Sequence, residues 1–385
     1  MSRYIVFGFL AAALATTGAS AQEFVSFGAA KGALYTPSNP SNVAFLVIHR
    51  TSSDLDHIAT VELPKRGYRV LGMDTYCVGD ETAVDFDLIA LDIRAGVRFL
   101  RKQPGVTKVV LLGSSGGGQT TAYYQATAKS EDKADGIVFA DAHVGISVTN
   151  LRALNPLESD LDPFDERNGY NPDGDSTYSS QFVDRYSRAQ SKRMNELITK
   201  AKNASGGGDD SFVVRHAAAR LSDLSTGVQP GTLNQRKLIK NDGSIRTQII
   251  TTVRVSDPGL KEDDDTFARG ALDLTVDSFL RANSIASTHA LNGIDWCSDP
   301  ASTICSARKI TVPALVLVAT GHYFIRDGEQ IFTNLGSQNK DFFAIEGMKH
   351  GLTPCGACSA QTGVSYANAT KNAFDRVASW AKGGF

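Results

Sequence analysis

The chain has 385 residues, of which 42% are hydrophobic and 21% are charged, and its formal net charge is −2. This is the composition of an ordinary globular protein, and it excludes a disordered or fibrous chain. No basic stripe stands out, so the sequence gives no sign of a nucleic-acid or membrane-surface partner.

Residues 1–21 have the pattern of a secretory signal peptide. Arg3 supplies a basic start, residues 4–15 form an apolar run, and residues 19–21 form a small-x-small cleavage site. The apolar run is too short to span a bilayer, and no later segment is long enough. We therefore expect residues 1–21 to be removed and the mature protein to be secreted or periplasmic, with no membrane span.

Short apolar runs alternate with amphipathic segments along much of the chain. The runs are rich in β-branched residues and lack strict alternation, as expected for strands that are buried on both faces of a parallel sheet. A helix is predicted over residues 85–103 and another near the C-terminus, because each has a single apolar stripe. This order predicts an α/β fold, a mostly parallel central sheet flanked by helices. The expected strands are 43–49, 68–73, 108–113, 136–141, 313–319 and 341–347.

The alternation stops after the fourth of these strands. We expect residues 144–310 to form one large insertion, a cap that packs over the sheet edge, while residues 22–143 and 311–385 form the core. The aromatic residues of the insertion either line a substrate pocket or, in the interpretation we favour, form the insertion's own core. They are Phe164, Tyr170, Tyr178, Phe182 and Tyr186.

Two pairs of cysteines lie close together in the sequence. In an exported protein such pairs predict disulfides, here Cys297–Cys305 and Cys355–Cys358, which leaves Cys77 unpaired. The second pair also has the spacing of a redox-active C-x-x-C. That interpretation requires a thioredoxin-like strand before a helix that begins at the motif, and the sequence lacks this pattern, so we favour a structural bridge.

Residues 113–117 read Gly-Ser-Ser-Gly-Gly and fit the motif G-x-S-x-G, with Ser115 at its centre. The motif follows a predicted strand and precedes a predicted helix, which is the setting of a strained turn that exposes a nucleophilic serine. The N–H of Gly116 then points to a developing oxyanion. A phosphate-binding glycine loop is the alternative, but the lysine of a P-loop is missing.

This strand–turn–helix motif, together with His350 after the last predicted strand, resembles the α/β-hydrolase family. The resemblance spans most of the mature chain and implies that His350 is the base that activates Ser115. The family usually places the acid soon after the seventh strand, where this chain has His322 and Tyr323. A minority of members place it at the end of strand six, where Asp141 stands. We expect Asp141 to be the acid, with Glu329 and Asp327 as alternatives.

The resemblance also implies a second oxyanion donor in the loop after the third strand, where the family often has His-Gly. Here the loop reads His49-Arg50-Thr51, so the backbone N–H of Arg50, or that of Thr51, takes this role. His143 and His322 are expected to line the pocket at most.

Taken as a member of this family, the chain would be a secreted serine hydrolase that cleaves a carboxylic ester or a lactone by acyl transfer, with no cofactor and no metal. Two alternatives remain open. The same residues could hydrolyse a carbon–carbon bond of a diketone, or the chain could be a catalytically silent binding protein of this fold.

Overall fold

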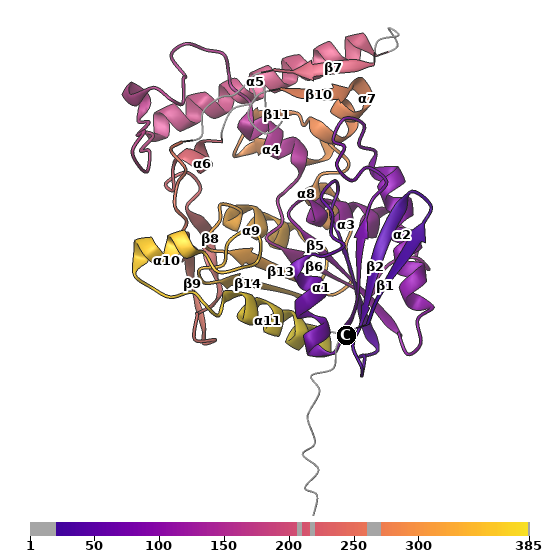
Figure 1. The fold of residues 1–385 in the computed structure, drawn as a ribbon. Helices are drawn as coiled ribbons and strands as arrows, with labels where there is room; N and C mark the ends of the chain where they lie inside the picture. Colours follow the sequence, from indigo (N-terminus) through magenta and orange to yellow (C-terminus); the bar gives the residue numbers. More distant parts are fainter. Residues whose placement is uncertain (1–20, 206–209, 216–219, 260–270, 384–385) are drawn as a thin grey trace, which may run out of the picture.

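The computed structural model describes residues 21–205, 210–215, 220–259 and 271–383. The expected signal peptide lies outside these residues except for Ala21, which begins the first strand. At the centre is a ten-stranded sheet with the order β1-β2-β4-β3-β5-β6-β13-β14-β8-β9 (Figure 1). The predicted α/β architecture with a mostly parallel sheet is confirmed.

The strands from β4 to β8 in this order run parallel, while β1, β2 and β9 are antiparallel to their neighbours. The six strands expected from the sequence are all present. The bounds are β1 (Ala21–Phe27), β2 (Ala30–Thr36), β3 (Val43–Ile48), β4 (Arg69–Asp74), β5 (Lys108–Ser114), β6 (Gly136–Ala140), β13 (Ala314–Ala319), β14 (Lys340–Ile345), β8 (Gly231–Ile239) and β9 (Ile245–Thr251).

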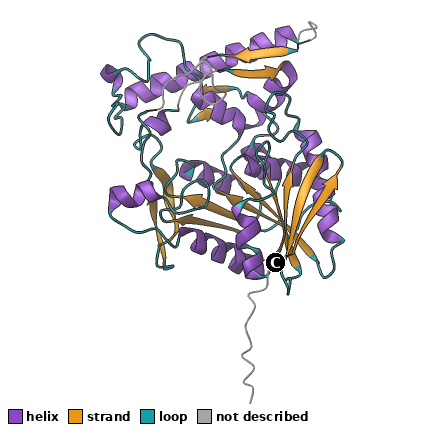
Figure 2. Cartoon of the chain, in the orientation of Figure 1, coloured by secondary structure: helices purple, strands orange, loops and turns teal. Residues whose placement is uncertain are grey.

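Helices cover both faces of the sheet, which explains why the central strands are apolar along their whole length (Figure 2). Successive residues of a strand point to opposite faces. Leu46 of β3 packs with the α2 side, while Phe45 packs with the α11 side. The first face is covered by α2 (Phe86–Arg101), α3 (Gly116–Thr127), α8 (Thr303–Ala307) and α9 (Ile325–Asn334), and the second by α1 (Ile58–Glu62) and α11 (Ala369–Gly383).

A second layer lies above the sheet in Figure 1. Its longest element is α5 (Ser180–Ala204), an amphipathic helix that begins at the N-cap Ser179. The other elements are short. They are α4 (Ile146–Ala153), η2 (Glu166–Asn168), β7 (Ser211–Val214), α6 (Leu221–Leu224), β10 (Leu272–Thr275), α7 (Val276–Ser278), η3 (Phe279–Asn283), β11 (Ser287–His289), β12 (Gly293–Ile294) and η4 (Trp296–Ser298).

The aromatic residues of this layer pack mainly against one another. Tyr178 stacks on Phe182 with ring centroids 5.2 Å apart, and Phe182 contacts Tyr186 at 5.6 Å. Phe164 and Tyr170 meet edge to face at 5.6 Å. These side chains therefore form the layer's own core, as the favoured interpretation of the sequence has it.

The structure divides the segment that was expected to form a single insertion. Within residues 144–310, β8 and β9 form a hairpin that joins the far edge of the central sheet, with β8 parallel to β14. The hairpin turns at Asn241, Asp242 and Gly243, and Gly243 has a φ of 85°. Apart from α8, which covers the sheet, the remainder of the segment supplies the second layer, so the core of the fold includes residues 231–251 and α8.

Candidate active site

Ser115 stands at the tip of the turn between β5 and α3, with φ 54° and ψ −124°. A positive φ is strained for any residue other than glycine, and it persists only where the surroundings enforce it. The glycines around Ser115 permit the close crossing of chains that does so. A side chain on Gly113 would collide with the backbone of Gly117, and one on Gly117 would collide with the carbonyl of Ile48.

Asp141 occupies the matching position on the neighbouring strand. Ser114 of β5 pairs in register with Ala140 of β6, so Ser115 and Asp141 leave adjacent parallel strands at the same level. Asp141 also has a positive φ, 49°, and its side chain is fully buried. Its Oδ1 accepts a hydrogen bond from the N–H of Ala319 at 2.9 Å, which turns Oδ2 toward the loop after β14.

His350 lies in that loop and faces Asp141. Its Nδ1 is 2.8 Å from Oδ2 of Asp141, with hydrogen-bonding geometry. A neutral imidazole in this position carries its proton on Nδ1, because a carboxylate can only accept, and Nε2 is left as an acceptor. The described residues include no hydrogen bond from Ser115 Oγ to this ring, and such bonds often tighten only when substrate binds.

The two alternative acids are engaged elsewhere in the described part of the chain. Glu329 accepts hydrogen bonds from the N–H groups of Leu233 and Asn234 and pairs with Arg236, so it ties α9 to β8. Asp327 pairs with Arg152 at 2.8 Å. Neither carboxylate contacts His350. Of the three candidates, Asp141 alone has the geometry that a partner of His350 requires.

The charge of Asp141 is stabilised by the rings around it. Burial alone would raise the pKa of its carboxyl, but His322 and His350 together hold that pKa well below its usual range. Asp141 is therefore ionised at neutral pH. An ionised carboxylate at this place is what keeps the proton on Nδ1 of His350.

The loop after β3 is fixed by side chains rather than by a glycine. Nδ1 of His49 accepts hydrogen bonds from the N–H groups of Thr51 at 3.2 Å and Ser52 at 2.9 Å. The buried Arg50 guanidinium pairs with Glu81, and the Arg50 carbonyl accepts from Thr75 Oγ1 at 2.6 Å. Since the Thr51 N–H is directed at His49, it is not the better oxyanion donor. The Arg50 N–H has no partner among the described residues.

Two neutral imidazoles converge on Gly116, the residue that follows Ser115. A Cβ at Gly116 would lie 2.8 Å from Nε2 of His49 and 3.5 Å from Nε2 of His143. Burial, followed by the charge of Arg50, lowers the pKa of His49 to about 3, and the same two causes hold the pKa of His143 well below its usual range. Nδ1 of His143 accepts from the N–H of Gly145 at 3.1 Å, as Nδ1 of His49 does from its loop, so each ring offers an N–H at Nε2.

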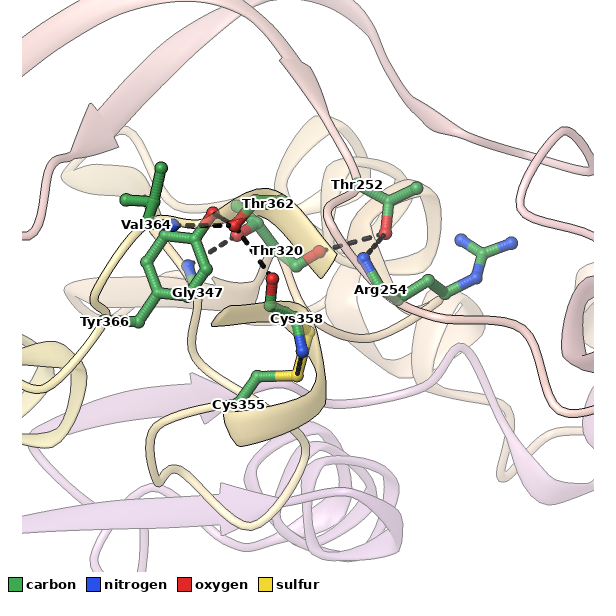
Figure 3. The surroundings of a disulfide bond; sticks show 9 residues. All are labelled: Thr252, Arg254, Thr320, Gly347, Cys355, Cys358, Thr362, Val364 and Tyr366. Atoms are coloured by element: carbon green, nitrogen blue, oxygen red, sulfur yellow. Dashed lines mark hydrogen bonds between the residues drawn. A yellow bond between two sulfur atoms is a disulfide. The ribbon is translucent and has the colours of Figure 1, made fainter. Parts of the chain in front are cut away.

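The Cys355–Cys358 disulfide lies a few residues after His350, and Figure 3 shows its surroundings, with Gly347 and Thr320 nearby. Cys355 is the N-cap of α10 (Gly356–Thr362), and its N–H donates to the carbonyl of Gly347 at 2.8 Å. The N–H of Gly347 in turn donates to Thr320 Oγ1 at 2.8 Å. The bridge thus fixes the start of α10, and the Cys355 N–H ties that start to Gly347, which precedes His350. The Cys297–Cys305 bridge is present too, and Cys77 is unpaired and buried, in agreement with the predicted pairing.

His322 stands closer to the acid than the sequence suggested. It was expected to line the pocket at most, yet its Nδ1 is 2.8 Å from the same Oδ2 of Asp141 that binds His350. The ligand atoms of these three residues lie within 4.8 Å of one another, as in a metal site. The two imidazole planes are inclined by only 24°, however, and one ion cannot lie in both nearly parallel planes at coordination distance. The arrangement fits proton transfer better than metal binding.

The strand order decides the fold. Without β8 and β9, the main sheet has the strands β1 to β6, β13 and β14. In space β3 and β4 are exchanged relative to the chain order, and β2 is antiparallel to its neighbours. The turn that carries Ser115 follows β5. A histidine follows the last of them, β14. The chain has the α/β-hydrolase fold. Asp141 directly follows β6, the sixth of these strands. No helix among the described residues is long and apolar enough to cross a membrane.

Comparison with known proteins finds matches among solved structures only. No protein-family model and no curated protein matches the sequence. Among solved structures, a hypothetical protein of Pseudomonas aeruginosa matches with 14% identity and a TM-score of 0.48, over 100% of both chains. A monoacylglycerol lipase of Paleococcus ferrophilus matches with 13% identity and a TM-score of 0.44, over 93% of this chain and 98% of that one. A monoglyceride lipase of Saccharomyces cerevisiae matches with 10% identity and a TM-score of 0.46, over 95% of both.

Proposed function

We propose that this α/β-hydrolase is a serine hydrolase that cleaves a carboxylic ester or a lactone by acyl transfer, without a cofactor. The observation that carries the proposal is the 2.8 Å contact between Asp141 Oδ2 and His350 Nδ1, beside a strained turn that presents Ser115. A silent binding protein would have no need of a strained serine next to a buried acid–imidazole pair.

The proposed mechanism uses three groups in sequence. His350 Nε2 removes the proton of the Ser115 hydroxyl as Oγ attacks the substrate carbonyl carbon. The negative charge on the carbonyl oxygen is held by the N–H groups of Gly116 and Arg50. His350 then gives its proton to the leaving oxygen, whose bond to the carbonyl carbon breaks, and an acyl-serine remains.

A water molecule completes the proposed reaction. It loses a proton to His350 Nε2 and attacks the acyl-serine, and the returned proton restores the Ser115 hydroxyl as the carboxylic acid leaves. Asp141 keeps its charge throughout and stabilises the imidazolium at both stages. Gly116, as the first residue of α3, has an N–H with no partner inside the helix, which suits it to the oxyanion.

We further propose that the second layer acts as a cap over the reacting groups and that the mature protein works outside the cytoplasm. The two disulfides support an oxidising compartment. The cap supports a small-molecule substrate, because α4 of this layer begins five residues after Asp141, which follows β6.

A substrate panel tests the proposed function. p-Nitrophenyl esters of increasing acyl length, lactones and a carbon–carbon-bonded diketone are assayed with the wild type and with Ser115→Ala. We expect hydrolysis of at least one ester or lactone that Ser115→Ala reduces by several orders of magnitude. Turnover of the diketone alone would replace the proposal with carbon–carbon bond hydrolysis, and activity that survives Ser115→Ala would refute the proposed nucleophile.

A further inference from the structure

His322 and His350 form a stacked pair over one carboxylate oxygen. Their ring centroids are 4.2 Å apart, and the Nδ1 atom of each ring lies 2.8 Å from Oδ2 of Asp141. Only His350 makes a hydrogen bond with proper geometry, and Nδ1 of His322 is left without one. Two nearly parallel rings cannot both direct an in-plane N–H at the same atom, so the two histidines compete for it.

Aromatic side chains hold the stacked pair in place. Phe324 meets both rings edge to face, with centroids 4.5 Å from His322 and 5.3 Å from His350. Tyr323 packs on His322 at 4.0 Å, and the Arg220 guanidinium lies 4.5 Å from the centre of the Tyr323 ring. His322 therefore has little room to turn away from Asp141.

We propose that His322 is a positioning residue for His350: its ring fixes the plane of the base, and its Nδ1 competes for the oxygen that binds the base. The proposal rests on the proposed function, in which His350 is the base. His322 does not touch the reacting atoms in this account. It acts through Asp141 and through the stack.

The competition changes the pH range of the base. When Asp141 shares its charge with a second ring, less of that charge acts on His350, so removal of the competing nitrogen should favour the imidazolium form. Among the described residues, the titratable groups within electrostatic reach of His350 are Asp141, His322, His49, His57 and His143, with Arg220 acting on His322. Burial lowers the pKa of each of the four histidines other than His350, which leaves Asp141 as the anion of the group.

Two substitutions separate the stack from the competition. His322→Phe keeps an aromatic ring against His350 but removes the nitrogen, while His322→Asn keeps a nitrogen donor near Asp141 but removes the ring. The pKa of His350 is measured by NMR titration with 15N-labelled histidine, without substrate. The chain has seven histidines, and His350→Gln assigns the signal. His289→Phe, at a cap histidine that faces Asp184, serves as the matched control.

We expect His322→Phe to raise the pKa of His350 by at least about half a unit and to retain most of the turnover. We expect His322→Asn to hold that pKa close to the wild-type value and to lower kcat about tenfold, because the base loses its support. The proposal is overturned if both variants leave the pKa and kcat at wild-type values, or if they shift both quantities alike. If His322→Phe does not fold, His322→Asn alone decides: an unchanged kcat or a clearly shifted pKa overturns the proposal.

The NMR titration needs no substrate, so its result does not depend on the reaction. If no ester or lactone is cleaved but the pKa shift is found, the proposed function fails and the coupling of His322 to His350 stands. If esters are cleaved but no shift is found, the coupling fails and the proposed function stands.

Discussion

Ser115 and Asp141 leave the neighbouring strands β5 and β6 at the same level, and both do so with a left-handed backbone, at φ 54° and 49°. Two strained residues side by side at the end of a parallel sheet are uncommon, because each costs about 1–3 kcal/mol. The pair brings a hydroxyl and a buried carboxylate to the same edge. His350 binds the carboxylate, and in the proposed mechanism it takes the proton of the hydroxyl.

The identity of the acid gives the first prediction. Asp141→Asn keeps the size of the side chain but favours the wrong tautomer of His350, so turnover should fall by about 10⁴-fold. Glu329→Gln should leave kcat within a few-fold, because Glu329 ties α9 to β8 and has no contact with His350 among the described residues. Steady-state kinetics of both variants provides the check. Comparable losses in both would mean that Asp141 has no special role.

The space beside Gly116, the proposed oxyanion donor, gives the second prediction. In Gly116→Ala the new methyl group would lie 2.8 Å from His49 Nε2, and His49 cannot easily retreat, because Nδ1 is held by two backbone N–H groups. We expect kcat to fall about 100-fold, because the turn that carries Ser115 has to shift. Gly356→Ala is the control, since a Cβ there has nothing within 4 Å. Equal kinetics for the two variants would show that the turn between β5 and α3 tolerates the methyl group.

The two disulfides should differ in their effect on turnover. By chain entropy, removing either small bridge costs about 2–3 kcal/mol of unfolding free energy. Among the described residues, Cys355–Cys358 is the bridge next to the loop of His350: it fixes the start of α10, where the Cys355 N–H donates to Gly347. We expect Cys355→Ala/Cys358→Ala to lower kcat about tenfold at a temperature where the protein stays folded.

The matched control for that prediction is Cys297→Ala/Cys305→Ala. This bridge lies at the start of α8, and its cysteines make no hydrogen bond to the loop after β14 among the described residues, so its removal should lower the melting temperature without changing kcat. Thermal unfolding and initial rates are measured on both double variants. A loss of turnover in the control, or none in the test variant, contradicts the bracing role.

A buried aspartate makes a prediction about stability and pH. Asp299 is fully buried, where burial raises its pKa to about 7 despite hydrogen bonds from Ser147 Oγ at 2.5 Å and the Ala301 N–H at 2.9 Å. Because the folded-state pKa lies above the unfolded value, this group's contribution to stability is lost as pH rises from about 4 to 7.

Asp299→Asn removes this pH dependence, since the amide cannot ionise. We expect the difference in unfolding free energy, variant minus wild type, to be more favourable to the variant at pH 7.5 than at pH 4.5. Urea unfolding of both proteins at the two pH values gives the double difference. If the variant loses more stability at pH 7.5 than at pH 4.5, Asp299 is ionised in the fold and is paired more strongly than its burial indicates.

The core of this fold could be read from the sequence because its strands are buried on both faces and are apolar along their length. The outer strands could not. β8 and β9 carry many polar residues, because this edge of the sheet is partly exposed to solvent. They also lie where the alternation of strands and helices along the sequence stops. The Asp242-Gly243 pair was the signal that could have revealed their hairpin.

The site was predictable to a similar degree. Ser115 and His350 stand in motifs that depend on local order along the chain, so the sequence locates them. The contact of Asp141 with His350 joins residues 209 positions apart and depends on the register of two strands, which left Glu329 and Asp327 open. The stacking of His322 on His350 arises from two loops that follow different strands. Its position directly after β13 was the available signal.

The covalent labelling of Ser115 tests the central claim most directly. The mature protein is treated with a fluorophosphonate, and the adduct is located by peptide mass spectrometry in the wild type, in Ser115→Ala and in Ser114→Ala. We predict one adduct on Ser115, no adduct in Ser115→Ala, and labelling of Ser114→Ala at a rate near that of the wild type, because the activated hydroxyl stands at the tip of the turn. An adduct on Ser114, or no adduct on the wild-type protein, would contradict the account.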